Sequence, residues 1–87
     1  MKTIKTSVLI PTGLHAGPAR HFIQEAKKFP CLVKIRFRGR EFDAKSMIGI
    51  LGAGIAYGDM VEIVCTGEHE EDACSALAEF LCSTHGA

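Results

Sequence analysis

His15 is the residue of this sequence whose type and position best suit chemistry. It lies in the stretch GLHAGPAR, residues 13 to 20, where a strand pattern has ended and a helix pattern begins. If the helix begins at Ala16, His15 is its N-cap, and the unpaired amides of the first turn point toward the ring. A helix N-terminus attracts anions, and an unprotonated imidazole is a nucleophile near neutral pH. These features suit a histidine that accepts a phosphoryl group, but they are equally compatible with a histidine that only caps the helix.

The residues that follow His15 are compatible with a bound phosphoryl group. The amides of Ala16 and Gly17 belong to the first turn, where backbone donors have no partner within the helix. A glycine also lets a ligand approach the backbone closely. Pro18 is tolerated there because its missing N–H would have been unpaired in any case.

Ser46 is a second candidate site. Serine is a favoured N-cap, and this one precedes the apolar, glycine-rich segment MIGILGAGIA. A phosphate on its hydroxyl would lie at a helix N-terminus beside Lys45, so modification is electrostatically permitted. A capping role alone would also explain the residue.

The segment after Ser46 contains more apolar side chains than one helical stripe can bury. These are Met47, Ile48, Ile50 and Leu51. We expect some of them to face outward, where an apolar patch with a flexible methionine would suit a protein partner. The alternative is that all four belong to the core.

The elements that must position these residues follow from the hydrophobic periodicity. Alternating residues predict strands, and apolar residues at spacings of three and four predict amphipathic helices. In chain order we expect a strand over 3–10, a helix over 16–29, a hairpin over 32–44 that turns near Arg38-Gly39, a short helix over 47–52, a strand over 60–66 and a last helix that follows the acidic connection 67–71. This order predicts an α+β domain with one antiparallel sheet and helices on a single face.

Length and composition narrow the class of protein further. With 87 residues and a hydrophobic content of 47%, the chain is expected to be one globular domain, residues 1–87. A net charge of zero, no tryptophan and one tyrosine argue against nucleic-acid binding. No apolar run approaches the roughly 18 residues of a membrane span, and no signal peptide is recognisable, so we expect no membrane insertion and a cytoplasmic location.

Four cysteines raise the question of disulfides or a metal. They stand at positions 31, 65, 74 and 82, with no C-x-x-C pair and no zinc-type cluster with histidine. In a cytoplasmic chain we interpret them as inert residues of the core or of a helix face. No metal site is predicted.

Three motifs resemble one known family. The stretches G-L-H-A-x-P-A at 13–19, K-S-M-I-G at 45–49 and L-G-A-G at 51–54 are similar to HPr, the histidine-containing phosphocarrier of the bacterial sugar phosphotransferase system. The likeness covers nearly the whole chain. It implies an open-faced β-sandwich in βαββαβα order, with four antiparallel strands and three helices on one face. It also implies a carrier without turnover of its own, without a cofactor and monomeric.

The resemblance also implies roles for particular residues. His15 would be phosphorylated by enzyme I at the expense of phosphoenolpyruvate and would pass the group to enzyme IIA proteins. Ser46 would be the target of HPr kinase/phosphorylase in bacteria that have it. Partners would dock on the first helix and the short second helix, which agrees with the surplus of apolar side chains at Met47, Ile48 and Leu51.

One position departs from the family motif. Where G-[IL]-H-A-R-P-A has arginine, this chain has Gly17. An arginine would hold the phosphoryl oxygens with a planar, permanently charged fork, and losing such a charge commonly costs a few kcal/mol. We expect slower phosphotransfer, unless Arg20, one turn further along, reaches back to replace it. The alternative function is a regulatory interaction module, switched by phosphorylation of Ser46, with little or no phosphotransfer.

Overall fold

Four strands and three helices make up the computed structural model, which describes residues 1–83. In chain order the elements are β1 (Lys2–Ser7), α1 (Ala16–Lys27), β2 (Leu32–Phe37), β3 (Arg40–Asp43), α2 (Met47–Ala53), β4 (Met60–Thr66) and α3 (Glu70–Cys82). The order is the βαββαβα order expected from the sequence. No helix within residues 1–83 is long and apolar enough to cross a membrane.

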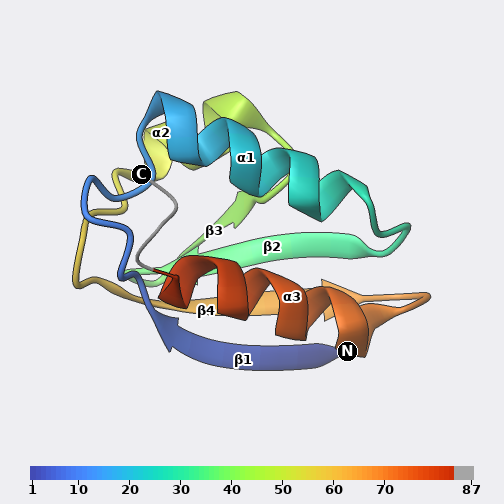
Figure 1. Ribbon diagram of the computed structural model, residues 1–87. Helices are drawn as coiled ribbons and strands as arrows, with labels where there is room; N and C mark the ends of the chain where they lie inside the picture. The colour runs from blue at the N-terminus through green and yellow to red at the C-terminus, as the bar shows by residue number, and fades with distance from the viewer. Residues whose placement is uncertain (84–87) are drawn as a thin grey trace.

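The strands form one antiparallel sheet in the order β1-β4-β2-β3, and the helices lie on one of its faces (Figure 1). This confirms the predicted α+β architecture. The β2–β3 hairpin turns through Arg38 and Gly39, which both have positive φ, 52° and 77°. Two such residues are what a tight two-residue hairpin needs, because their twist matches that of the strands.

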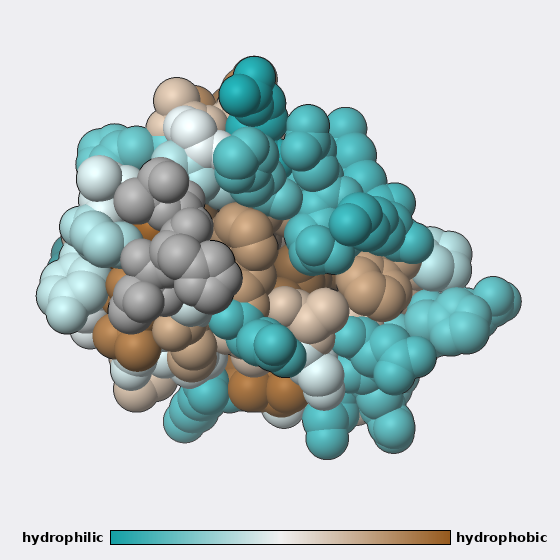
Figure 2. Space-filling view, in the orientation of Figure 1, coloured by the Kyte–Doolittle hydropathy of each residue, from teal (hydrophilic) through white to brown (hydrophobic). Residues whose placement is uncertain are grey.

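The core lies between the sheet and the helices. Ile35 and Ile63 are paired across the central strands and are fully buried. The ring of Phe22 on α1 meets that of Phe80 on α3 edge to face, with centroids 5.8 Å apart. Polar residues cover most of the outer side of α1 in the view of Figure 2. The helices therefore each present one apolar stripe to the sheet, as their periodicity predicted.

Several predicted boundaries were wrong by a few residues. The first strand was expected to reach residue 10 but ends at Ser7, because the backbone of Val8 pairs with the loop before β4: its N–H donates to Asp59 O (2.8 Å) and its C=O accepts from Gly58 N–H (2.7 Å). The first helix ends at Lys27 rather than residue 29. The second helix, expected over 47–52, ends at Ala53, and Gly54 is its C-cap in the left-handed conformation. Val8 and Ile10 are buried like strand residues although they lie in a loop, so an apolar pattern alone does not locate the end of a strand.

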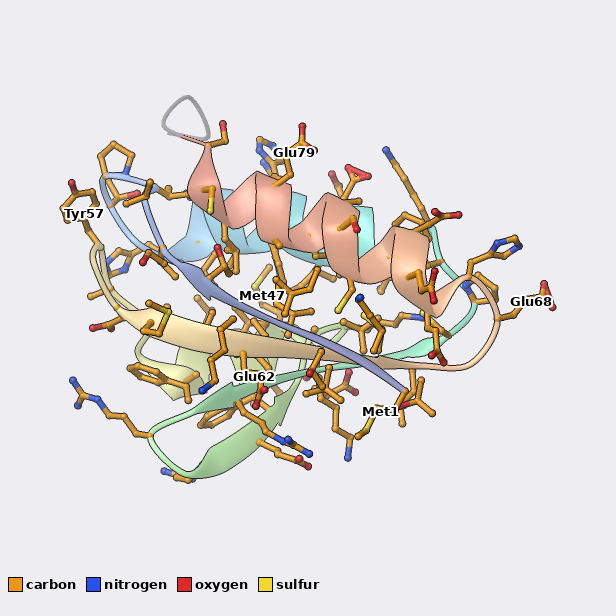
Figure 3. The ribbon with its side chains drawn as sticks, turned by 90° about the horizontal axis from the view of Figure 1, so that it is seen from below. Met1, Met47, Tyr57, Glu62, Glu68 and Glu79 are labelled. Carbon is orange, nitrogen blue, oxygen red and sulfur yellow. The ribbon has the colours of Figure 1, made fainter. Side chains whose placement is uncertain are left out.

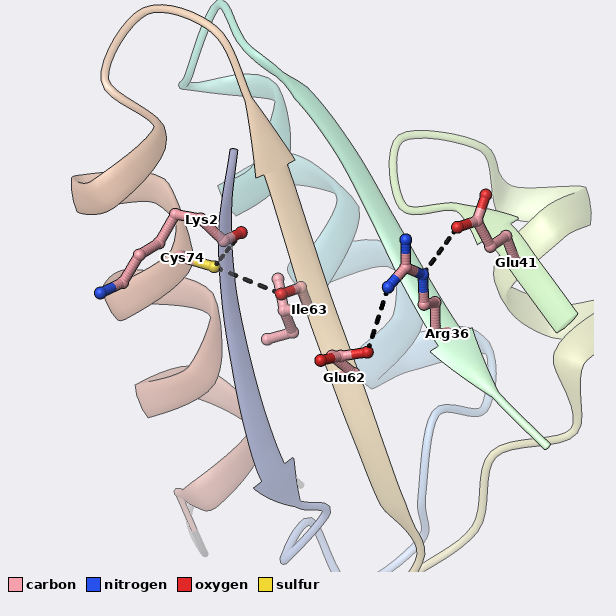
Figure 4. Close-up of polar contacts among 6 residues, drawn as sticks. All are labelled: Lys2, Arg36, Glu41, Glu62, Ile63 and Cys74. Carbon is pink, nitrogen blue, oxygen red and sulfur yellow. Dashed lines mark hydrogen bonds and ion pairs between the residues drawn. The ribbon is translucent and has the colours of Figure 1, made fainter. Parts of the chain in front are cut away.

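Three of the four cysteines belong to the core, as the composition predicted. Cys31, Cys65 and Cys74 are buried, Cys82 is exposed on α3, and all four are free. Burial raises the pKa of the Cys65 and Cys74 thiols. The Cys74 thiol donates to the carbonyl oxygens of Lys2 (3.3 Å) and Ile63 (3.4 Å), which ties α3 to β1 and β4 (Figure 4). Such thiols behave as small apolar residues and not as nucleophiles.

The open face of the sheet carries a row of alternating charges that crosses all four strands. Lys5 on β1 lies opposite Glu62 on β4, Glu62 opposite Arg36 on β2, and Arg36 opposite Glu41 on β3. The Arg36 guanidinium donates to Glu41 Oε2 at 2.7 Å and to Glu62 Oε1 at 3.4 Å (Figure 4). Opposite charges placed directly across strands stabilise a sheet modestly.

The ion pair between Arg36 and Glu41 predicts how the stability of the fold changes at low pH. The hydrogen bond from Arg36 holds the pKa of the Glu41 carboxyl below its usual range. The pair therefore stabilises the fold above the ordinary carboxyl pKa of the unfolded chain, and this contribution disappears as the pH falls through the lowered pKa of Glu41. Arg36→Met is expected to raise the Glu41 pKa toward its usual value, as measured by an NMR pH titration.

The matched variant is Lys34→Met. The Lys34 ammonium lies 3.7 Å from Glu41 Oε1, and its effect on the Glu41 pKa is smaller than that of Arg36. We therefore expect a smaller rise in this variant. A Glu41 pKa that does not change in Arg36→Met would contradict the assignment.

Candidate functional site

His15 stands where the sequence predicted it, at the N-cap of α1. Its backbone is extended, with φ −84° and ψ −177°, and its side chain makes no capping hydrogen bond. The residue is exposed, and the first turn of α1 contains no acidic residue. The ring therefore does not stabilise the helix end through a hydrogen bond, so capping does not explain this histidine.

A close backbone contact fixes the loop that carries His15. Gly13 has φ 70°, and a Cβ built on it would lie 2.8 Å from both Ala56 Cα and Ile55 O. The next residue, Leu14, is buried and donates its N–H to Ile55 O at 3.0 Å. Residues 13 and 14 are thus fastened to the loop that follows α2, so the loop leading into α1 lies against the loop leaving α2. Only glycine allows both this φ and this approach.

The first turn of α1 leaves two amide donors available. The first backbone hydrogen bond of the helix runs from Ala19 N–H to His15 O at 2.7 Å, and Pro18 has no N–H. Within residues 1–83, no hydrogen bond to the amides of Ala16 or Gly17 is present. Both residues are exposed. An anion bound to the His15 ring could therefore accept hydrogen bonds at this helix end.

Arg20 lies one helical turn beyond these amides and is exposed. In the part of the chain that the structure describes, its guanidinium has no hydrogen bond and no ion pair. It is therefore available to an anion, which is what the proposed replacement of the motif arginine requires.

Ser46 caps α2, as expected. Its Oγ accepts a hydrogen bond from Gly49 N–H at 3.2 Å. Lys45, which we expected to favour a phosphate on Ser46, is engaged elsewhere: its Nζ donates to Phe29 O and to Cys31 O, both at 2.7 Å. The ammonium thus ties the start of α2 to the loop between α1 and β2, a contact that local sequence patterns do not predict.

The apolar residues of α2 divide between core and surface. Ile50 is fully buried, whereas Met47, Ile48 and Leu51 are exposed, Ile48 by 87%. This confirms the prediction that some of the four face outward. Sequence analysis missed Tyr57, which is 60% exposed in the loop after α2 and projects at the edge of the molecule (Figure 3). The loop of Tyr57 contacts the His15 loop through Ile55, and hydrophobic periodicity does not predict a contact between two loops.

The site is an open surface and not a pocket. A hollow of about 540 Å³ lies elsewhere, between α1 and α3, and is lined by Glu25, Phe80 and Cys82 among others, without His15. Within residues 1–83, no group of three potential ligands is arranged to hold a metal ion. An exposed histidine ring of this kind is accessible to the site of another protein.

Comparisons with known proteins agree with this geometry. The family model described as the PTS HPr component phosphorylation site matches residues 2–83. The chain is 35% identical over 77 residues to the HPr-like protein Crh of Bacillus subtilis, covering 88% of this chain and 91% of that protein. It is 32% identical over 81 residues to the phosphocarrier protein HPr of Lysinibacillus sphaericus, covering 93% of this chain and 92% of that protein.

Two solved structures extend the likeness to three dimensions. HPr-C-His from Thermoanaerobacter tengcongensis superimposes with a TM-score of 0.94 at 34% identity, covering 100% of this chain and 98% of that one. An HPr dimer from the same organism gives a TM-score of 0.71 at 35% identity and covers 91% of each chain. Dimers are thus found among the relatives of this fold.

The contact at Gly13 leads to a stability prediction. Gly13→Ala is expected to lower the free energy of unfolding by about 2–4 kcal/mol, because alanine disfavours positive φ and its methyl group overlaps the backbone of residues 55 and 56. Urea denaturation measures this. Gly52→Ala is the matched control: this helical glycine has open space around it, and alanine there should add about 0.5–1 kcal/mol. Equal stability of the Gly13→Ala variant and the wild type would refute the proposed constraint.

Proposed function

Because this chain belongs to the HPr family of the phosphotransferase system, a family of phosphocarriers and not of enzymes with their own turnover, we propose that it accepts a phosphoryl group on His15. Enzyme I would be the donor and enzyme IIA proteins the acceptors, in the cytoplasm. The observation that carries the proposal is the exposed His15 ring, which makes no capping hydrogen bond and is followed by two amide donors without partners.

The chemistry of the step follows from that arrangement. The lone pair of an unprotonated ring nitrogen attacks phosphorus, and the bond from phosphorus to the donor breaks with its electron pair leaving on the donor. Once one ring nitrogen carries the phosphoryl group, the proton on the other ring nitrogen can be released to solvent, which removes the positive charge of the ring. The amides of Ala16 and Gly17 and the dipole of α1 then stabilise the anionic group. In transfer to an acceptor, a nucleophile of the acceptor attacks phosphorus, and the bond from phosphorus to the His15 nitrogen breaks with its electron pair returning to the ring.

The positive charge that this chain itself supplies is limited. Gly17 contributes an amide and no charge, and Arg20 is the cation within one turn of the site. We propose that Arg20 leans back toward the N-terminus of α1, as helical side chains do, and contacts the phosphoryl oxygens. With these groups alone, and with a partner that supplies no cation of its own, transfer is expected to be slower than in a family member that has the motif arginine.

The exposed residues Met47, Ile48 and Leu51 provide a docking surface for these partners in our proposal. They lie on α2, which packs against α1 near the His15 loop. Apolar residues of this kind lose contact with water when a partner binds, so they contribute affinity without competing for the phosphoryl group.

The carrier function predicts an acid-labile phosphate on His15. Incubation with enzyme I and labelled phosphoenolpyruvate should label the wild type, and His15→Ala should abolish the label because the nucleophile is gone. His21→Ala is the matched control, since His21 is an exposed histidine on the same helix, and it should keep the label. Arg20→Ala should slow labelling about tenfold or more if its guanidinium contacts the phosphoryl group.

A wild-type protein that stays unlabelled, while an ordinary HPr is labelled alongside, would refute this function. Label that persists in His15→Ala would instead place the phosphate on another residue.

A second function is favoured by one specific observation: the relatives divide between phosphocarrier HPr and the HPr-like protein Crh at about 35% identity. We propose that phosphorylation of Ser46 regulates binding to partner proteins, with HPr kinase/phosphorylase as the modifying enzyme. The Ser46 hydroxyl stands at the start of the α2 surface, so a phosphate there would change the charge at the edge of the docking surface.

This role predicts an acid-stable phosphate on Ser46 after incubation with the kinase and ATP. Ser46→Asn is the informative variant, because asparagine caps a helix about as well as serine and cannot accept the phosphate. It should fold normally and remain unlabelled. Failure of a competent kinase to label the wild type would rule out this second role without affecting the first.

A further inference from the structure

Gly17 is a glycine that the fold does not require. Among the described residues, most glycines have positive φ, and Gly49 lies so close to Asp43 O that a Cβ would be 3.1 Å from it. Gly17 has neither constraint: its φ is ordinary and a Cβ would meet nothing within 4 Å. Glycine in a helix costs stability relative to alanine, so the backbone supplies no reason for its presence. Gly52 on α2 has the same freedom, but Gly17 lies in the first turn of α1, two residues after His15, where its exposed side faces the space beside the ring.

The surface around His15 is also almost without positive charge. No lysine or arginine occurs in residues 6–19 or 46–61, the segments that form the His15 loop, α2 and the loop after it. Lys45, at the border, already donates to two carbonyl oxygens. Arg20 is the cation that remains nearby. A phosphoryl group adds between about one and two negative charges, which this surface does not balance.

The open space over Gly17 and the scarcity of positive charge around His15 together indicate what a docked partner would have to supply. The position over Gly17 is open to solvent and adjoins the two amides that face an anion on His15. On α2, which packs against α1, and in the loop after it, Ile48, Leu51 and Tyr57 are exposed and uncharged. A partner that docks on this apolar surface can extend a side chain into the open position. Because the phosphoryl group is anionic and few cations of this chain lie near it, a cationic side chain would stabilise it there.

We propose that the open position over Gly17 receives an arginine or lysine side chain of the docked partner, which completes the phosphoryl site. Gly17 thereby selects partners that bring their own cation. This inference rests on the phosphocarrier function proposed above. It makes residue 17 a specificity-determining position: a side chain there would fill the space, and a cationic one would in addition repel the partner's charge.

The test compares Gly17→Arg with Gly17→Gln, which fills the position without charge. The donor is enzyme I from the organism that encodes this chain, and the readout is the initial rate of His15 labelling from phosphoenolpyruvate as a function of carrier concentration. We expect Gly17→Arg to be slower than Gly17→Gln by about tenfold or more, mainly through a higher KM, because like charges meet at the interface. The difference should shrink as salt is raised from about 50 to 500 mM, since salt screens the repulsion.

Ser75→Arg is the control for net charge. Ser75 is an exposed residue of α3, so this variant adds the same charge away from His15 and should label at the wild-type rate. If Gly17→Arg is faster than the wild type, or equal to Gly17→Gln at every salt concentration, no cation enters from the partner and the inference is overturned. These results are distinct from a failure of the carrier function, in which the wild type itself remains unlabelled.

Discussion

The close approach of Gly13 to the backbone of Ile55 and Ala56 is the contact on which the functional surface depends. It joins two loops that are distant in the sequence, one leading into α1 and the other leaving α2. α2 also packs against α1, and the Gly13 contact adds the loop that carries His15 to this arrangement. The exposed His15 ring, two unpaired amides and the apolar residues of α2 thereby belong to neighbouring elements. The positive φ and the missing Cβ are both used, so this position tolerates no other residue easily.

The sequence predicted those features that arise from local chemistry. The N-cap positions of His15 and Ser46 follow from residue type and from the start of an apolar period, and both are present in the structure. The outward-facing residues of α2 were predicted by a simple count of apolar side chains. The hairpin turn was predicted from a glycine between alternating strands. Each of these inferences needs only residues that lie within a few positions of each other.

Features that depend on distant partners were not predictable in this way. Val8 alternates like a strand residue but pairs with the loop before β4, so β1 ends earlier than the pattern suggests. Lys45 was expected beside Ser46 as a charge that permits phosphorylation, but its ammonium donates to two carbonyl oxygens of the loop between α1 and β2. The loop that carries the exposed Tyr57 meets the His15 loop through residues 55 and 56, which contact Gly13 and Leu14. The physical interactions are ordinary, but the fold decides which residues meet.

The charge row on the open face has a consequence for how the strands align. A slip of two residues between neighbouring strands keeps every apolar side chain on the same face, so hydrophobic burial by itself does not oppose it. Such a slip between β2 and β4 would place Arg36 opposite Met60 or Val64 instead of Glu62, and one between β1 and β4 would remove Lys5 from Glu62 as well. The alternating charges therefore distinguish the native alignment from neighbours that the core alone would accept. Their value lies in selecting one register, even though each exposed pair adds little stability.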